Sequence, residues 1–205
     1  MKSLCRMAIL AAIVLGLAGP ASAQTGKKDA GPAPPDSASL VKAMVNAMEP
    51  GEGQKKLEGW VGTFDVKILT WLDPSKPPSE SPGVAVCQWV LGGRYIQIML
   101  SAFVMGEPFN AIAYAGYDNV SKKYVTTYMD SGSTGMEWYT GTIALDGKSA
   151  KMAATIHDEI TGKPTKVEMR IVFTPDGNHH TELWQADKSG KMQKVMDVQY
   201  TRKKS

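Results

Sequence analysis

Cysteine is almost absent from this sequence. The chain has two cysteines in 205 residues, Cys5 and Cys87, and Cys5 lies in an N-terminal segment that we expect to be removed. A single remaining thiol cannot form an intrachain disulfide, so the apolar core alone must stabilise the folded protein. Cys87 alternates with Val86 and Gln88, and we expect it to be a buried, inert thiol.

Catalytic signatures are absent as well. The sequence contains no Gly-x-Ser-x-Gly elbow, no His-Glu-x-x-His, no Cys-x-x-Cys and no glycine-rich phosphate loop that opens a helix. His179 and His180 are neighbours in an expected strand and would point to opposite faces, so the two cannot bind one metal ion. The sequence therefore predicts no catalytic residue, no metal site and no cofactor.

The chain also lacks a large excess of charge of either sign. It has 23 Lys and Arg against 20 Asp and Glu, and two of the basic residues, Lys2 and Arg6, precede an expected cleavage site. Proteins that bind nucleic acids usually carry a clustered basic face. We therefore expect no nucleic acid among the partners.

No hydrophobic run is long enough to cross a bilayer. The apolar run at residues 7–17 has about half of the roughly 20 residues that a membrane-spanning helix needs. Lys2 and Arg6 precede this run and Ala21-Ser22-Ala23 follow it, which is typical of a secretory signal peptide. We expect residues 1–23 to be a signal peptide cut after Ala23, the protein to be periplasmic or secreted, and no transmembrane segment.

The composition changes twice after the expected signal peptide. Residues 24–38 are rich in Pro, Gly, Ala and charge, cannot bury enough apolar surface to fold, and are predicted to be a flexible linker. Leu40, Val41, Met44 and Met48 then recur at helical spacing. Residues 39–61 are therefore predicted to be a short helical segment, with one or two helices that cover the domain that follows.

From Gly62 onward the hydrophobic period changes from 3.6 to 2, which predicts strands joined by short turns. No helix is long enough to connect parallel strands, so the sheet must be an antiparallel meander. Closing the sheet into a barrel over residues 62–203 removes its exposed edges, and the interior is either filled or open to one small ligand. The fold class is thus all-β, with about ten strands expected at Thr63–Trp71, Val84–Leu91, Arg94–Met105, Phe109–Tyr117, Lys123–Asp130, Met136–Leu145, Ala150–Glu159, Thr165–Thr174, His179–Ala186 and Gln193–Arg202.

Several short motifs in this region resemble a known family. They are Gly92-Gly93-Arg94-Tyr95, Met105-Gly106-Glu107-Pro108-Phe109, Gly116-Tyr117-Asp118-Asn119 and the sequence MDVQYTR at residues 196–202. In order and spacing they resemble the bacterial domain-of-unknown-function 1579 family. The resemblance implies a calycin-like barrel and implies no activity.

A second likeness concerns the closure of the barrel. In lipocalins a Gly-x-Trp motif opens the first strand, and a late Arg packs over the indole ring. Here Trp60 precedes Gly62-Thr63-Phe64, and Arg202 lies in the last expected strand. By this analogy Trp60, Phe64 and Arg202 are expected to close one end of the barrel, with a cation–π contact.

Some strand faces mix aromatic residues and Met with a few polar side chains, as a cavity wall does. The alternative is ordinary packing, with Tyr hydroxyls satisfied at the barrel ends. Arg94 and Arg202 are available to pair with an acidic ligand head group. The candidate binding residues are Arg94, Tyr95, Tyr114, Tyr124, Tyr128, Asp130, Met136 and Trp138.

Three functions remain open at this point. The preferred one is binding of a small hydrophobic or amphipathic ligand in the barrel. The second is a hydrolase or isomerase that uses Tyr117, Asp118 and Asp130 as acid–base groups, although no sequence motif marks these residues as catalytic. The third is a structural or interaction module without a ligand, which would expose a sizeable apolar patch. The sequence does not indicate the oligomeric state.

Overall fold

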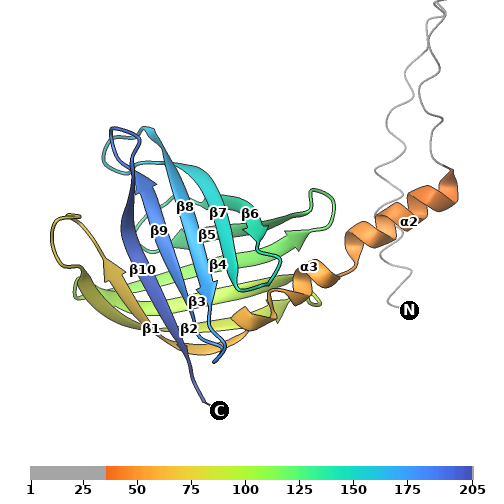
Figure 1. Ribbon diagram of the computed structural model, residues 1–205, viewed down its shortest axis with the longest axis horizontal. Helices are drawn as coiled ribbons and strands as arrows, with labels where there is room; N and C mark the ends of the chain where they lie inside the picture. The colour runs from red at the N-terminus through yellow and green to blue at the C-terminus, as the bar shows by residue number, and fades with distance from the viewer. Residues whose placement is uncertain (1–35, 205) are drawn as a thin grey trace, which may run out of the picture. The chain divides into compact units, whose positions relative to one another are not determined.

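The computed structural model describes residues 36–204. These residues form a closed barrel in which each strand pairs antiparallel with the next and β1 pairs with β10 (Figure 1). The predicted all-β fold class, a closed antiparallel meander, is therefore confirmed. The strands are β1 (Gly62–Thr70), β2 (Ser79–Val90), β3 (Tyr95–Val104), β4 (Glu107–Asp118), β5 (Lys123–Asp130), β6 (Glu137–Ile143), β7 (Ser149–His157), β8 (Pro164–Phe173), β9 (His179–Ala186) and β10 (Met192–Arg202).

From residue 36 onward, three short helical elements precede the barrel: α2 (Ser37–Met48), α3 (Glu52–Lys55) and the 3-10 helix η1 (Glu58–Trp60). The expected signal peptide, residues 1–23, lies outside the described residues, and so does the expected linker 24–38 up to residue 35. None of the residues of α2 is buried. No helix among the described residues has the length and apolar character needed to traverse a bilayer.

The register fixes which turns lie at which end of the barrel. β1 begins opposite the end of β10, with Phe64 facing Arg202, and the turns that follow β2, β4, β6 and β8 lie at this same end because the strands alternate in direction. We call it the closed end, since Leu57 and Trp60 from the segment before β1 are buried there in the core cluster. The other end, where β1 finishes at Thr70 and β5 at Asp130, is the open end.

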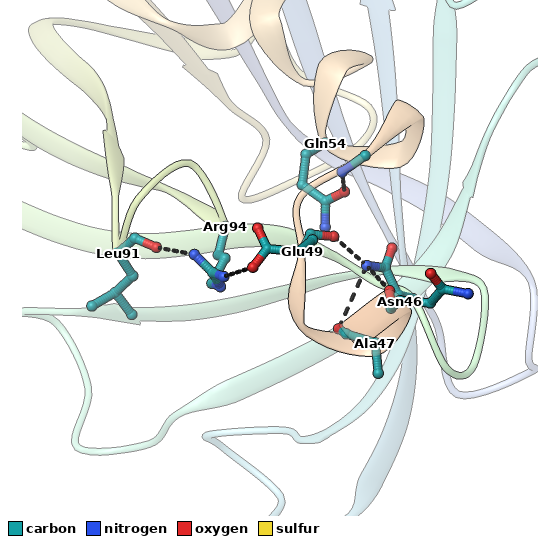
Figure 2. Close-up of polar contacts among 8 residues, drawn as sticks. Asn46, Ala47, Glu49, Gln54, Leu91 and Arg94 are labelled. Atoms are coloured by element: carbon teal, nitrogen blue, oxygen red, sulfur yellow. Dashed lines mark hydrogen bonds and ion pairs between the residues drawn. The ribbon is translucent and has the colours of Figure 1, made fainter. Parts of the chain in front are cut away.

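Hydrogen bonds attach the segment before the barrel to turns at the closed end. The Asn119 side-chain amide, in the turn after β4, donates to the carbonyl oxygens of Asn46 at 3.0 Å and Glu49 at 2.8 Å, at the C-terminal end of α2. Arg94, in the turn after β2, lies between the Leu91 carbonyl oxygen and the Glu49 carboxylate (Figure 2). Without Asn119, the carbonyl oxygens of Asn46 and Glu49 would lack this hydrogen bond at the end of α2.

We call α3 and η1 together the plug. Its position depends on Gln54 and on a close approach at Gly53. Gln54 is buried, donates to the Tyr117 carbonyl oxygen at 2.9 Å and accepts from the Gly51 amide at 2.8 Å. A Cβ atom at Gly53 would lie 2.1 Å from the Tyr117 ring. The backbone of α3 therefore packs directly on an aromatic ring, which a larger residue would prevent.

Candidate functional site

The barrel encloses a cavity of about 290 Å³. Most of its wall is apolar, and no lysine or arginine belongs to the wall among the described residues. Its volume is at the lower end of the roughly 300–1,000 Å³ of typical ligand pockets, so it suits a compact molecule. The wall is formed by Trp60, Ile68, Thr70, Cys87, Ile98, Leu100, Val104, Phe109, Ala111, Ala113, Thr126, Tyr128, Asp130, Glu137, Tyr139, Met169, Ile171, His179, Thr181, Leu183, Met196, Val198 and Tyr200.

Small inward-facing side chains on two strands explain why the interior is not filled. On β4 the buried positions Ala111, Ala113 and Ala115 alternate with exposed neighbours. On β2 the inward face carries Ala85 and Cys87, both buried. Ala111 and Ala113 line the cavity, and side chains from the other strands do not fill the space beside them. The cavity is thus a direct consequence of the alternation in β4.

The two carboxyl groups of the cavity wall lie on β5 and β6. Tyr128 and Glu137 face each other in the register of these strands, and both line the cavity with Asp130 and Tyr139. The Tyr139 hydroxyl donates a short hydrogen bond to the Glu137 carboxylate. Because burial disfavours the charged form, the pKa of Glu137 is raised, as are those of Tyr128 and Tyr139.

Asp130 is held in place by the turn that follows it. Its carboxylate accepts from the backbone amides of Gly132 at 2.9 Å and Ser133 at 3.1 Å. Asp130 is the last residue of β5 and Glu137 the first of β6, so two carboxyl groups lie on one wall toward the open end. No cation in the wall neutralises them, and this side of the cavity repels anions.

Aromatic rings surround His179 toward the closed end. Its imidazole stacks on Tyr200 with ring centroids 4.2 Å apart and meets the edge of Phe64 at 5.0 Å. Its Nδ1 and the Trp60 Nε1 are buried without a hydrogen-bond partner in the described structure. Burial, with smaller contributions from Arg202 and His180, lowers the pKa of His179 from its usual 6.5 to about 4.

Replacing His179 with phenylalanine should flatten the pH dependence of stability between about pH 7 and pH 4. In the folded protein His179 stays neutral down to about pH 4, whereas in the unfolded chain it binds a proton from 6.5 downward. Stability contributed by neutral His179 is therefore fully present above pH 6.5 and is lost as the pH falls toward 4, by about 3 kcal/mol. Urea unfolding of both proteins at the two pH values measures the difference.

The comparison of the two proteins isolates this one group. Carboxylates such as Glu137, whose raised pKa acts in the opposite direction over the same window, are present in both. His179→Phe retains a ring against Phe64 and Tyr200, so the packing is largely conserved. Parallel pH profiles for the variant and the wild type would contradict the assignment of a buried neutral imidazole.

Arg202 closes the barrel at the closed end. Its guanidinium donates to the carbonyl oxygens of Val61 at 2.7 Å, Gly59 at 3.0 Å and Gly177 at 3.2 Å. Its Cζ lies 4.7 Å from the centroid of the Phe64 ring. Trp60 instead stacks on Phe173, at 5.9 Å between centroids. The structure thus brings Trp60, Phe64 and Arg202 to one end, with the arginine over Phe64 rather than over the indole.

The structure places the residues of the expected binding set in three groups. Tyr128 and Asp130 line the cavity. Tyr124 is buried and donates to the Gly53 carbonyl oxygen at 3.0 Å, so it supports the plug. Arg94 is paired with Glu49 outside the cavity wall. The remaining four belong to the outer surface of the barrel: Tyr95, Tyr114, Met136 and Trp138.

Strand alternation explains why Tyr114 and Trp138 lie outside. The inward positions of β4 are its alanines, so Tyr114 points outward. On β6, Tyr139 is 1 % exposed and Trp138 is 58 % exposed, so the inward face is the one that carries Glu137 and Tyr139. Met136 precedes β6 and is 66 % exposed. From the sequence we expect the aromatic face of each strand to form the cavity wall. Two alanines of β4, Glu137, Tyr139 and His179 also line it and were not predicted.

The three residues considered as acid–base groups of an enzyme, Tyr117, Asp118 and Asp130, do not lie together in the fold. Asp118 ends β4 at the closed end, whereas Asp130 ends β5 at the open end. The Asp118 carboxylate accepts from the Val120 amide at 2.8 Å and shapes the turn there, and neither Asp118 nor Tyr117 belongs to the cavity wall. Among the described residues, no group of three or more His, Cys, Asp and Glu side chains is arranged to hold a metal ion.

Comparisons with known proteins agree with this fold. The model of the family DUF1579, described as "Protein of unknown function (DUF1579)", matches residues 49–202. Among solved structures, the chain is similar to the crystal structure of Rv2717c from M. tuberculosis, with a TM-score of 0.57 and 14 % sequence identity. That similarity covers 76 % of this chain and 100 % of the other, and it concerns the fold alone. A search of the curated proteins found no match.

Proposed function

This chain belongs to the DUF1579 family, whose proteins are of unknown function, and we propose that it binds a compact apolar or amphipathic molecule in its barrel cavity. The observation that carries the proposal is a largely apolar cavity of about 290 Å³ inside a closed barrel. Burial of apolar ligand surface in such a site provides the affinity, and a few polar groups orient the ligand.

The charge of the wall narrows the class of ligand. Asp130 and Glu137 lie on one side, and the described wall has no lysine or arginine. Arg202, considered earlier as a partner for an acidic head group, already donates to three backbone carbonyls, and Arg94 pairs with Glu49. The ligand proposed here is therefore neutral or positively charged at its polar end, with an amine or hydroxyl that donates to the carboxylates.

We further propose that the protein acts outside the cytoplasm. The support is the N-terminal pattern of two basic residues, an apolar run and Ala21-Ser22-Ala23, which is typical of a cleaved export signal. A ligand taken from the periplasm or the medium would reach the cavity without crossing a membrane.

Three ligands with one alkyl chain and different head groups test the charge preference. Octylamine, octanol and octanoate are titrated against a fluorescent apolar probe, N-phenyl-1-naphthylamine, bound to the purified protein. We expect the amine and the alcohol to displace the probe, and octanoate to bind about 10-fold or more weakly than the amine, because each tenfold ratio needs only about 1.4 kcal/mol of charge repulsion.

Two results would contradict the proposal at different levels. Failure of the probe and of all three ligands to bind would overturn the binding function itself. Tightest binding by octanoate would retain a binding protein and overturn the argument from the acidic wall. Extraction of copurified ligand, followed by mass spectrometry, would identify the natural compound.

A further inference from the structure

Ion pairs lie on the outer surface of β7 to β10, which we call the charged half of the barrel. On β7 and β8, Glu168 pairs with Lys151 at 2.7 Å and with Arg170 at 2.5 Å. On β9 and β10, Lys194 pairs with Glu182 at 3.0 Å. Such ion pairs are typical of a solvated surface.

Strands β2 to β6 present a different outer face. One row across the sheet consists of paired apolar residues, and the next consists of neutral polar and aromatic residues. No outward-facing side chain in the two rows carries a charge. The first row is Val86, Met99, Ile112 and Met129, and the second is Gln88, Gln97, Tyr114, Thr127 and Trp138. We call these two rows the neutral face.

The polar groups of the neutral face bond to each other along the row. The Gln88 amide donates to the Gln97 side-chain oxygen at 3.2 Å, and the Gln97 amide donates to the Tyr114 hydroxyl at 2.9 Å. Met99, Ile112, Tyr114 and Trp138 are nevertheless exposed. An aromatic and apolar patch of this kind, without charge, has the composition of the centre of a protein interface.

We propose that the neutral face is the contact surface of a homodimer, formed by a second copy of this chain on a two-fold axis. In such an interface each patch meets itself. Residues near the axis face their own copies, so a charged side chain there would meet a like charge, which costs several kcal/mol; the neutral face has no charged side chain to place there. Its side-chain amides and hydroxyls both donate and accept hydrogen bonds, so they can pair with groups of the same kind on the other copy.

The charge distribution favours a second copy over a partner with a charged surface. A basic or acidic partner would find its complementary charges on the other half of the barrel, at Lys151, Glu168 or Lys194. The neutral face has nothing to pair with buried charges, and burying them unpaired is costly. The inference does not depend on what the cavity binds.

The test is the mass of the purified protein in solution. Sedimentation or light scattering across about 1–100 μM, a range that covers moderate dimer affinities, should show twice the monomer mass at the high end. Ile112→Lys places an unpaired ammonium in each half of the interface, and we expect the dissociation constant to rise by about 100-fold or more.

Val172→Lys is the matched control. Val172 points outward from β8 on the charged half and is 38 % exposed, compared with 39 % for Ile112, so each substitution replaces a β-branched apolar side chain with lysine at nearly equal exposure. The control should keep the wild-type dissociation constant. Met99→Lys, at the position paired with Ile112, should repeat the effect of the first variant, with circular dichroism showing that each variant is folded.

Two outcomes would overturn the inference. One is a wild-type protein that stays monomeric at every concentration, which would show that the neutral face does not bind a second copy of this chain. The other is a dimer that Val172→Lys weakens as much as Ile112→Lys does, which would place the contact elsewhere on the barrel.

Discussion

Replacing Arg202 with alanine is expected to destabilise the protein by about 4 kcal/mol, since three backbone carbonyls lose a charge-assisted donor and leaving one such group unsatisfied costs about 1–3 kcal/mol. The carbonyls belong to Gly59, Val61 and Gly177, so the plug, β1 and the turn before β9 all loosen together. For a chain of this size the melting temperature should fall by about 8–16 °C. Thermal unfolding followed by circular dichroism measures the change.

Arg170→Ala is the control for this prediction. Like Arg202, Arg170 lies over an aromatic ring, at 4.3 Å from the Trp184 centroid; it pairs with the Glu168 carboxylate. It lies on the outer surface, however, where exposed ion pairs contribute about 0–1 kcal/mol. Equal losses of stability for the two variants would show that Arg202 has no special role in closing the barrel.

Replacing Ala113 with phenylalanine is expected to reduce binding of the apolar probe by about 100-fold or more, because the ring occupies the space that the ligand would fill and the lost burial exceeds about 2.8 kcal/mol. Ala113 lies at the middle of β4, between Ile98 and Tyr128 in the sheet register, and lines the cavity. Stability should change little, because the new side chain fills empty volume. Probe fluorescence and a melting curve report the two quantities separately.

The neighbouring position supplies the control for the cavity. Ile112 precedes Ala113 on β4 and points outward, so Ile112→Phe adds a ring to the same strand without entering the cavity. It should bind the probe as the wild type does. If Ala113→Phe also binds the probe with wild-type affinity, the site of binding is not this cavity. Ala111→Leu, one inward position away, provides a smaller obstruction in case the phenylalanine prevents folding.

The strands could be predicted from the sequence because turn-forming residues such as Asp-Gly stand between them. Asp146-Gly147 lies between β6 and β7, and the predicted strand Thr165–Thr174 differs by one residue at each end from β8, Pro164–Phe173. The main exception is β2, which begins at Ser79 rather than at Val84 and includes Pro82. Residues 79–82 pair only with β1, because pairing with β3 starts at Gly83. With one side of the strand free, a proline there costs no ladder bond on that side.

The inner face of each strand could not be predicted in the same way. Alternation shows that a strand has two faces and does not show which one is inside when neither face is charged. On β5 the aromatic face, with Tyr124 and Tyr128, lies inside, whereas on β4 the aromatic Tyr114 lies outside and the alanines lie inside. The register of the whole barrel decides this, and it depends on contacts between strands that are distant in sequence.

The pairing of β1 with β10 has a consequence for the order of folding. Phe64 pairs with Arg202, so closing the barrel requires a contact between the first and the last strand of the meander. Contacts of such long separation are slow to form. Until they do, β1 and β10 present open edges to other molecules, and a chain arrested before β10 would leave β1 and β9 exposed and prone to aggregate.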